Sequence, residues 1–116
     1  MTPLDLDSTL AALAEPTRRR VVDYLRRGPR RAGELADHFR VSAPAMSRHL
    51  RVLRKSGLVE ERGLDEDARV RVYRLRAEPF HELEVWLEQI ASFWQTQLIA
   101  FKAHAEKHAA KRARRK

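Results

Sequence analysis

The stretch VSAPAMSRHLRVLRKS, residues 41–56, determines how the rest of the chain is interpreted. Ser42 is a good N-cap residue, because its hydroxyl can accept a hydrogen bond from an unpaired amide of the first helical turn. Pro44 is tolerated within that turn, where its missing N–H is not needed. Gly57 follows a basic run and readily adopts the left-handed conformation in which helices often end. The sequence therefore predicts a helix over residues 43–56.

This predicted helix has two contrasting faces. At about 100° per residue, the apolar side chains of Met46, Leu50 and Leu53 fall on one side. The opposite side combines hydroxyls, cations and a proline, but no acid: Pro44, Ser47, Arg48, Arg51 and Lys55. A solvated helix face usually mixes charges of both signs, which attract one another at i,i+4 spacing. An acid-free face instead suits a DNA major groove, where arginine pairs with guanine O6 and N7.

Composition restricts the class of protein. With 116 residues, 43% hydrophobic and 34% charged, the chain fits one soluble globular domain with a modest core. It has no cysteine, which excludes disulfides, thiolate metal sites and thiol redox switches. No apolar run approaches the roughly 20 residues of a membrane helix, and the N-terminus lacks the basic region of a signal peptide. We therefore expect a cytoplasmic protein with no membrane association.

The net charge of +8 is unevenly distributed. Residues 16–55 carry twelve lysines and arginines against three acids, whereas residues 77–106 carry one lysine against five acids. The last ten residues add six more basic side chains. The positive charge is therefore concentrated around the predicted helix 43–56, as expected for a protein that binds a polyanion.

Three shorter helices are predicted before this one, over residues 8–14, 17–27 and 31–39. Apolar residues recur at helical spacing in each of them, and Pro16 and the Gly28-Pro29 pair separate them. Residues 40–42 then form a short turn that contains no glycine. Two short helices joined by a tight turn, with the second one basic, predict a helix-turn-helix.

Two groups of arginines precede the turn. Arg30 and Arg31 lie just before the third helix, and we predict that they contact the DNA backbone. Arg18, Arg19 and Arg20 open the second helix either as phosphate contacts or as a solvated basic turn. The second interpretation is favoured for at least two of these three.

A β-hairpin is predicted after helix 43–56. Residues 58–62 and 69–75 have the β-branched and aromatic content of strands, and a polar loop at 63–68 separates them. A hairpin in this position is a wing, and its Arg69 and Arg71 are predicted to contact phosphate or the minor groove. Three acids at the tip, Asp65, Glu66 and Asp67, would face the phosphates, so we expect only a weak wing contact.

The longest helix is predicted from residue 79 to about residue 107. Its apolar residues recur at steps of three and four, and two aromatic residues widen the stripe: Leu83, Trp86, Leu87, Ile90, Phe93, Trp94, Leu98 and Phe101. A domain of this size is too small to bury them all, so the stripe predicts a partner helix in a two-fold dimer. The alternative is a long helix that folds back onto its own domain. Residues 108–116 are predicted to be a basic, disordered tail that adds sequence-independent affinity for DNA.

Residues 8–104 resemble the ArsR-type winged-helix transcriptional repressors of bacteria. The resemblance is carried by LAEPTRRRVVDYL, by RAGELADHFRVSAPAMSRHLRVLRKSGLVEER, by a strand ending in VYRL, and by a long helix containing tryptophan. It implies a mainly α winged helix-turn-helix fold with about five helices and a small β-hairpin. It also implies a homodimer held by the first helix, through Leu10, and by the last helix. The implied function is repression through a short inverted repeat in a promoter.

The resemblance implies no metal site and no other cofactor. Many relatives bind metal through a cysteine pair at the start of the third helix, but Arg31 and Gly33 occupy those two positions here. His104 and His108 are spaced i,i+4 near the C-terminus, but the carboxylate-histidine cluster of other relatives does not precede them. With Phe93-Trp94 in its last helix, the chain is most similar to the cysteine-free branch of the family. An inducer ligand is not specified by these residues.

We therefore predict a homodimeric DNA-binding repressor. Bases or adjacent phosphates would be contacted by Ser42, Ser47, Arg48 and Arg51, and the DNA backbone by Arg30, Arg31, Arg69 and Arg71. The alternative is a protein-interaction module whose winged helix does not recognise DNA sequence. An enzyme is not expected, because the sequence has no phosphate-binding glycine loop, no His-Glu metal motif and no nucleophile cluster.

Overall fold

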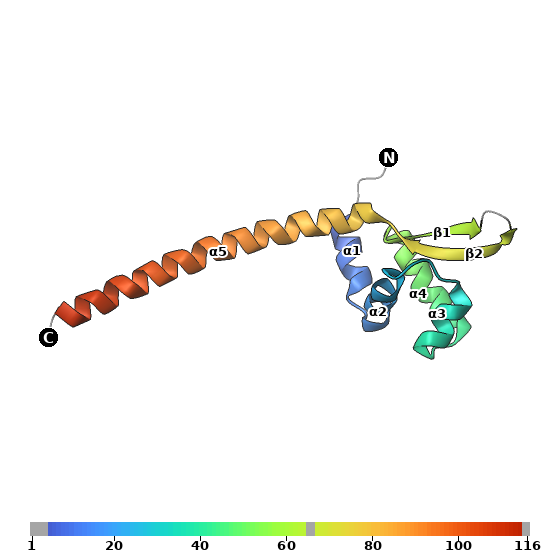
Figure 1. Ribbon diagram of the computed structural model, residues 1–116, viewed down its shortest axis with the longest axis horizontal. Helices are drawn as coiled ribbons and strands as arrows, with labels where there is room; N and C mark the ends of the chain where they lie inside the picture. Colours follow the sequence, from blue (N-terminus) through green and yellow to red (C-terminus); the bar gives the residue numbers. More distant parts are fainter. Residues whose placement is uncertain (1–4, 65–66, 115–116) are drawn as a thin grey trace. The chain divides into compact units, whose positions relative to one another are not determined.

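The computed structural model describes residues 5–64 and 67–114. These residues form a mainly helical fold with one antiparallel hairpin (Figure 1). In chain order the elements are α1 (Leu6–Leu13), α2 (Pro16–Leu25), α3 (Ala32–Phe39), α4 (Ala43–Lys55), β1 (Val59–Leu64), β2 (Asp67–Leu75) and α5 (Ala77–Arg114). The chain divides into two compact units, residues 1–83 and 84–116, and each is described by itself.

The first two helices begin where an acidic side chain caps them. α1 starts at Leu6, two residues earlier than predicted, because the Asp5 carboxylate accepts a hydrogen bond from the Asp7 amide. α2 starts at Pro16, and the Glu15 carboxylate accepts from the Arg18 amide. These caps satisfy amides that have no partner inside a helix. The predicted end of the second helix at residue 27 was two residues too long.

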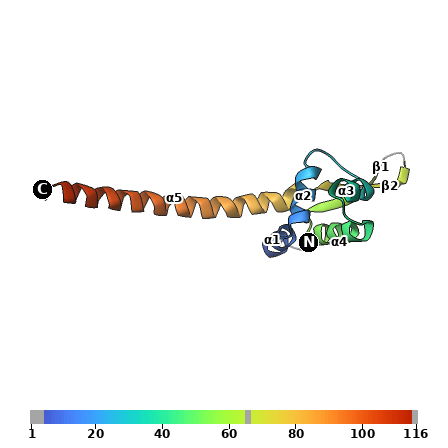
Figure 2. The ribbon, with the colours of Figure 1, turned by 90° about the horizontal axis from the view of Figure 1, so that it is seen from below.

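The core of the first unit lies under α4. Met46, Leu50 and Leu53 are fully buried, as the periodicity of α4 predicts. They pack in one cluster with side chains from the neighbouring elements, including Val21 of α2 and Leu35 of α3. In Figure 2, α3 and α4 lie beside one another, with the short turn of residues 40–42 joining them. The apolar side of α4 is thus held by the core, which fixes the direction of its other side.

The hairpin is longer than predicted. β1 reaches Leu64 and β2 begins at Asp67, so the expected loop 63–68 is wrong at both ends, and residues 65 and 66 lie outside the described part. Gly63 pairs with Arg71, and the register then shifts between Gly63 and Leu64. The pairing therefore continues into the stretch that polarity alone predicts to be a loop.

Arg30, in the segment before α3, is connected to the sheet by backbone hydrogen bonds. Its amide donates to the carbonyl of Tyr73, and the amide of Tyr73 donates back to the carbonyl of Arg30 at 2.7 Å. This single bridge connects the segment before α3 to β2. The wing is therefore attached directly to the helix-turn-helix by the backbone.

The second unit consists of the continuation of α5 from Glu84. The helix extends to Arg114, so the prediction of a disordered tail from residue 108 is corrected as far as residue 114. Alanine, lysine and arginine are strong helix formers, and basic side chains near a C-terminus interact favourably with the helix dipole. The division between a domain at 1–107 and a tail stays a prediction. Within residues 5–64 and 67–114, none of the helices combines the length and the hydropathy that a membrane span requires.

Candidate nucleic-acid interface

The outer face of α4 is exposed and cationic. Its side chains point away from the buried core residues and all are exposed: Pro44, Ser47, Arg48, Arg51 and Lys55. No acid lies on α4 itself. Arg48, Arg51 and Lys55 form no ion pair within the described residues. The structure thus brings together all five predicted residues of this helix on one open surface.

Ser42 acts first as the cap of α4. Its Oγ accepts a hydrogen bond from the Ala45 amide at 3.2 Å, as predicted. The side chain is nevertheless exposed at the N-terminal end of the basic face. A helix N-terminus carries a partial positive charge and unpaired amides, which favour an anion such as phosphate.

The turn before α4 has an unusual backbone. Arg40 ends α3 with φ 55° and ψ 42°, and it is the only non-glycine residue with positive φ among those described. This left-handed conformation costs most residues about 1 kcal/mol relative to glycine. The Val41 amide donates to the carbonyl of Ala36, which stabilises the turn. Arginine therefore occupies the position that many helix-turn-helix turns give to glycine.

The wing arginines have acidic partners within the hairpin. The Nε of Arg71 donates to Glu61 at 2.9 Å, and Glu60 forms ion pairs with both Arg62 and Arg74. The side chain of Arg71 is still about half exposed. Arg69 is exposed on the same strand. The side chains of Arg69 and Arg71 are thus accessible, although Arg71 already forms an ion pair with Glu61.

These ion pairs change the acidity of the wing carboxylates. The hydrogen bond from Arg71 holds the pKa of Glu61 below its ordinary value against the opposing effect of burial. The hydrogen bond from Arg74 does the same for the pKa of Glu60. Burial and the nearby charge of Glu61 raise the pKa of the Tyr73 hydroxyl. Both carboxylates are therefore ionised at neutral pH and neutralise part of the positive charge of the hairpin.

Arg30 and Arg31 differ in their surroundings. The guanidinium of Arg30 lies 4.9 Å from the centre of the Tyr24 ring, and it donates to the carbonyl of Pro29. Arg31 is exposed at the N-cap of α3, where its amide donates to Glu34. Arg31 is thus open to a ligand at a helix N-terminus, whereas Arg30 is half-buried against an aromatic ring.

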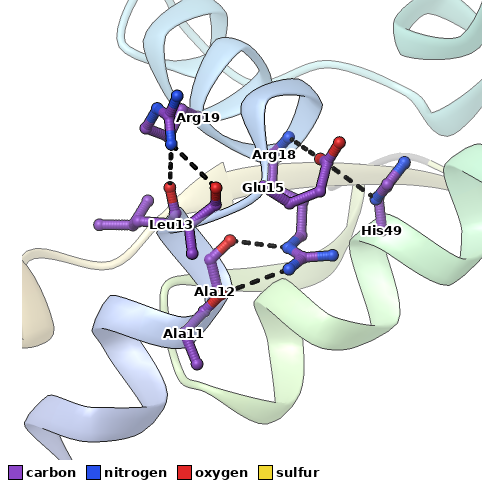
Figure 3. Close-up of polar contacts among 8 residues, drawn as sticks. Ala11, Ala12, Leu13, Glu15, Arg18, Arg19 and His49 are labelled. Carbon is purple, nitrogen blue, oxygen red and sulfur yellow. Dashed lines mark hydrogen bonds and ion pairs between the residues drawn. The ribbon is translucent and has the colours of Figure 1, made fainter.

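Arg18 and Arg19 bind the end of α1 (Figure 3). The Nε of Arg18 donates to the carbonyl of Ala12 at 2.7 Å, and Arg19 donates to the carbonyl of Leu13 at 2.9 Å. These carbonyls are at a helix C-terminus, where the last turn has no internal partners. Neither of the roles considered from the sequence, phosphate contact or solvated turn, describes these two side chains. Arg20 is exposed.

His49 connects α4 to the start of α2. Its Nδ1 lies 3.8 Å from the carboxylate of Glu15, the residue that caps α2 (Figure 3). Burial raises the pKa of Glu15, but amide hydrogen bonds from Arg18 and Thr17 and the charge of His49 outweigh it and lower that pKa overall. The His49 side chain therefore makes a structural contact inside the domain.

The predicted dimer residues leave apolar surface uncovered in both units. In the first unit Leu10 is exposed and Leu83 is half-buried. In the second unit Trp86 is half-buried, and the others are exposed: Leu87, Ile90, Trp94, Leu98 and Phe101. Trp94 is 57% exposed and packs edge-on against Phe93 with ring centres 5.5 Å apart.

Two histidines near the end of α5 make an edge-to-face ring contact. The rings of His104 and His108 have centres 4.3 Å apart on the exposed helix. Within residues 5–64 and 67–114, no group of three or more histidine, cysteine or acidic side chains could hold a metal ion.

Comparisons with known proteins identify the family. The model of the bacterial regulatory protein arsR family matches residues 15–61. The chain is 38% identical over 95 residues to the HTH-type transcriptional regulator Rv2034 of Mycobacterium tuberculosis, covering 82% of this chain and 83% of that protein. It is also 34% identical over 56 residues to the transcriptional repressor SdpR of Bacillus subtilis, covering 48% of this chain and 62% of SdpR.

A solved structure extends the match to the fold. An ArsR-like transcriptional regulator from Rhodococcus sp. RHA1 superposes with a TM-score of 0.69 at 33% identity, covering 84% of this chain and 89% of that one. These relatives are transcription regulators rather than enzymes. The chain belongs to the ArsR family of bacterial regulatory proteins, and it is a DNA-binding transcriptional regulator with a winged helix-turn-helix fold.

Proposed function

We propose that this protein is a homodimeric repressor that works in the bacterial cytoplasm and binds an inverted-repeat operator. In each protomer α4 enters the major groove and the wing lies against the flanking backbone. The observation that carries this proposal is the exposed outer face of α4, where Arg48 and Arg51 have no carboxylate partner within the described residues. These exposed guanidiniums are open to a binding partner, and DNA offers them guanine edges and phosphates.

The residues of α4 have different roles in this proposal. Arg48 and Arg51 form hydrogen bonds to base edges, since a guanidinium can bind guanine bidentately. Ser42 and Ser47 contact bases or adjacent phosphates, and the ring of Pro44 packs at the entrance to the groove. Lys55, near the C-terminal end of the helix, binds phosphate as a point charge.

The remaining basic residues position the protein on the DNA backbone. Arg31 is the best placed of them, because it is exposed at the N-terminus of α3. Arg69 and Arg71 contribute from the wing, with the contact of Arg71 weakened by its ion pair to Glu61. Arg30 contributes least, because it is half-buried against Tyr24. Such contacts set the register on DNA and carry no sequence information.

A second copy of the chain is the proposed partner for the exposed apolar residues. A single winged helix-turn-helix contacts too few base pairs for selectivity, and two-fold pairing doubles the site. Leu10 of α1 and the stripe from Leu83 to Phe101 in α5 supply the apolar surface that such an interface needs. No cofactor is part of this proposal.

The alternative of a protein-interaction module has less support, because the relatives are transcriptional regulators. Fluorescence anisotropy separates the two functions. Labelled DNA recovered from the fragments that the protein retains from its own genome is titrated at two salt concentrations, with a shuffled duplex as the control. A repressor of this kind binds the recovered duplex tightly, loses affinity steeply with salt and prefers it to the shuffled one. Equal, weak binding to both duplexes would reject sequence recognition.

A further inference from the structure

A cavity of about 480 Å³ opens between α2 and the last turn of α3. Its volume is within the range of small-molecule binding sites. The lining combines three arginines and one aspartate with three aromatic rings, and none of these residues takes part in the proposed DNA contacts. We propose that this cavity binds a small aromatic carboxylate.

The aromatic part of the cavity is already assembled. The rings of Tyr24 and His38 are stacked, with centres 4.0 Å apart and planes 15° apart. Phe39 meets both rings edge-on, at 5.8 Å from Tyr24 and 4.8 Å from His38. Aromatic rings favour these two arrangements, so a planar ligand can extend the cluster by stacking or by an edge contact. Because Tyr24 and Phe39 also pack against the core, little ordering is needed when the ligand binds.

The charged part of the cavity favours an anion. The carboxylate of Asp23 is 3.2 Å from Arg26, so one of the three guanidiniums is already neutralised. Arg20 has no acidic partner within the described residues, and the guanidinium of Arg27 lies 5.9 Å from the Tyr24 ring. Two of the three lining cations, Arg20 and Arg27, are thus without an acidic partner among the described residues, and outside the lining the guanidinium of Arg30 lies 4.9 Å from the Tyr24 ring. A planar guanidinium matches the two oxygens of a carboxylate, which indicates an acid group on the ligand's ring.

The position of the cavity connects it to the DNA-binding face. His38 and Phe39 are the last two residues of α3, and the left-handed Arg40 follows them directly. The turn then leads into α4 at Ala43. A ligand that contacts α2 and the end of α3 therefore acts on the segment that positions the recognition helix. This regulatory consequence rests on the proposed function, whereas the binding itself does not.

Benzoate is the probe that tests the site. Its binding is followed by isothermal titration calorimetry and by NMR shifts of the His38 ring on the full chain without DNA. The matched probes are benzamide, which keeps the ring without the charge, cyclohexanecarboxylate, which keeps the charge without the aromatic ring, and inorganic phosphate. We expect saturable binding of benzoate at millimolar concentration and at least about tenfold weaker binding of each control, which corresponds to the loss of one charge-assisted or stacking contact.

Variants connect the binding to the named residues. The double substitution Arg20→Gln and Arg27→Gln should weaken benzoate binding at least about tenfold. Arg112→Gln, the same change on the exposed end of α5, should leave it unchanged. His38→Leu removes an exposed ring and should also weaken binding, with circular dichroism checking that each variant is folded. Any one of three results overturns the proposal. Benzoate does not bind, it binds no better than cyclohexanecarboxylate or phosphate, or it binds the double variant with unchanged affinity.

The effect on DNA is measured separately. Operator affinity is determined by anisotropy with saturating benzoate and with saturating benzamide, for the wild type and the Arg20/Arg27 double variant. Coupling through the turn is supported if benzoate, but not benzamide, changes the operator affinity at least about threefold and if this change is lost in the double variant. Binding of benzoate with no change in operator affinity would overturn the coupling and keep the site. Failure to bind operator in the absence of any ligand would instead contradict the proposed function.

Discussion

The guanidinium of Arg54, at the end of α4, lies 2.9 Å from the carboxylate of Glu61 in β1. The other oxygen of the same carboxylate accepts a hydrogen bond from Arg71 in β2. One acid thus connects the recognition helix to both strands of the wing. Glu61 is one of the contacts that link the wing to α4, and with Arg54 paired to it, Arg48, Arg51 and Lys55 are the cations of α4 that have no acidic partner among the described residues.

Replacing Glu61 by Gln should loosen this connection. The change removes the charge of both ion pairs while it preserves the shape of the side chain, so the free energy of unfolding should fall by about 1 kcal/mol. Urea denaturation at pH 7 measures it. Glu82→Gln, at an exposed position of α5, is the matched control and should have almost no effect. An equal loss in the two variants would show that Glu61 has no special structural role.

The lowered pKa of Glu61 also predicts how stability depends on pH. Because the pKa in the folded state is below the value in the unfolded state, the ion pairs stabilise the protein fully above the unfolded value of about 4.3. This contribution is lost as the pH falls through the folded value. Denaturation between pH 7 and pH 3 should therefore show a steeper loss of stability in the wild type than in Glu61→Gln. Parallel curves for the two proteins would contradict the assignment.

Arg40 should be a site where glycine stabilises the fold. Its φ of 55° is unfavourable for a side chain with a Cβ, whereas glycine adopts it without strain. The greater freedom of glycine in the unfolded chain offsets part of this gain. Arg40→Gly should raise the free energy of unfolding by about 0.5 kcal/mol, and Arg40→Ala, which keeps the strain, should not. Thermal denaturation distinguishes them, and destabilisation by glycine would mean that the arginine side chain stabilises the turn.

The dimer is tested at Trp94. This side chain is 57% exposed on α5, and a glutamate there would place a charge in the proposed interface. Trp94→Glu should sediment as a monomer at micromolar concentration and lose operator binding. Gln95→Glu, a neighbouring polar position on the same exposed helix, is the control and should remain dimeric. A wild-type chain that sediments as a monomer would reject the interface.

The features predicted well from the sequence are those that depend on neighbouring residues. The cap at Ser42 and the buried positions Met46, Leu50 and Leu53 follow from local spacing, and the structure confirms them. The helix-turn-helix follows in the same way, because its parts are contiguous. The end of α5 was set too early, since the lack of apolar periodicity after residue 107 does not outweigh the helical propensity of alanine, lysine and arginine.

The features that were missed depend on contacts between elements. Arg18 caps α1 through the carbonyl of Ala12, which requires the relative placement of two helices that spacing alone does not give. The pairs of Glu60 and Glu61 with wing arginines depend on strand register. In the register Glu60 lies opposite Arg74, whereas Glu61 lies opposite Tyr73 and reaches Arg71 diagonally.

DNA recognition by α4 is tested most directly by the operator affinity of the double variant Arg48→Ala, Arg51→Ala. Arg26→Ala serves as the control, since its guanidinium is exposed at the C-cap of α2 and paired with Asp23. Fluorescence anisotropy on the recovered operator and on the shuffled duplex measures affinity and preference together. If the outer face of α4 recognises the operator sequence, each arginine contributes about 1–3 kcal/mol to the binding free energy. The double variant should then lose about 2–6 kcal/mol of operator binding and most of its preference for the operator over the shuffled duplex. Wild-type affinity and wild-type preference in that variant would contradict DNA recognition by these two arginines.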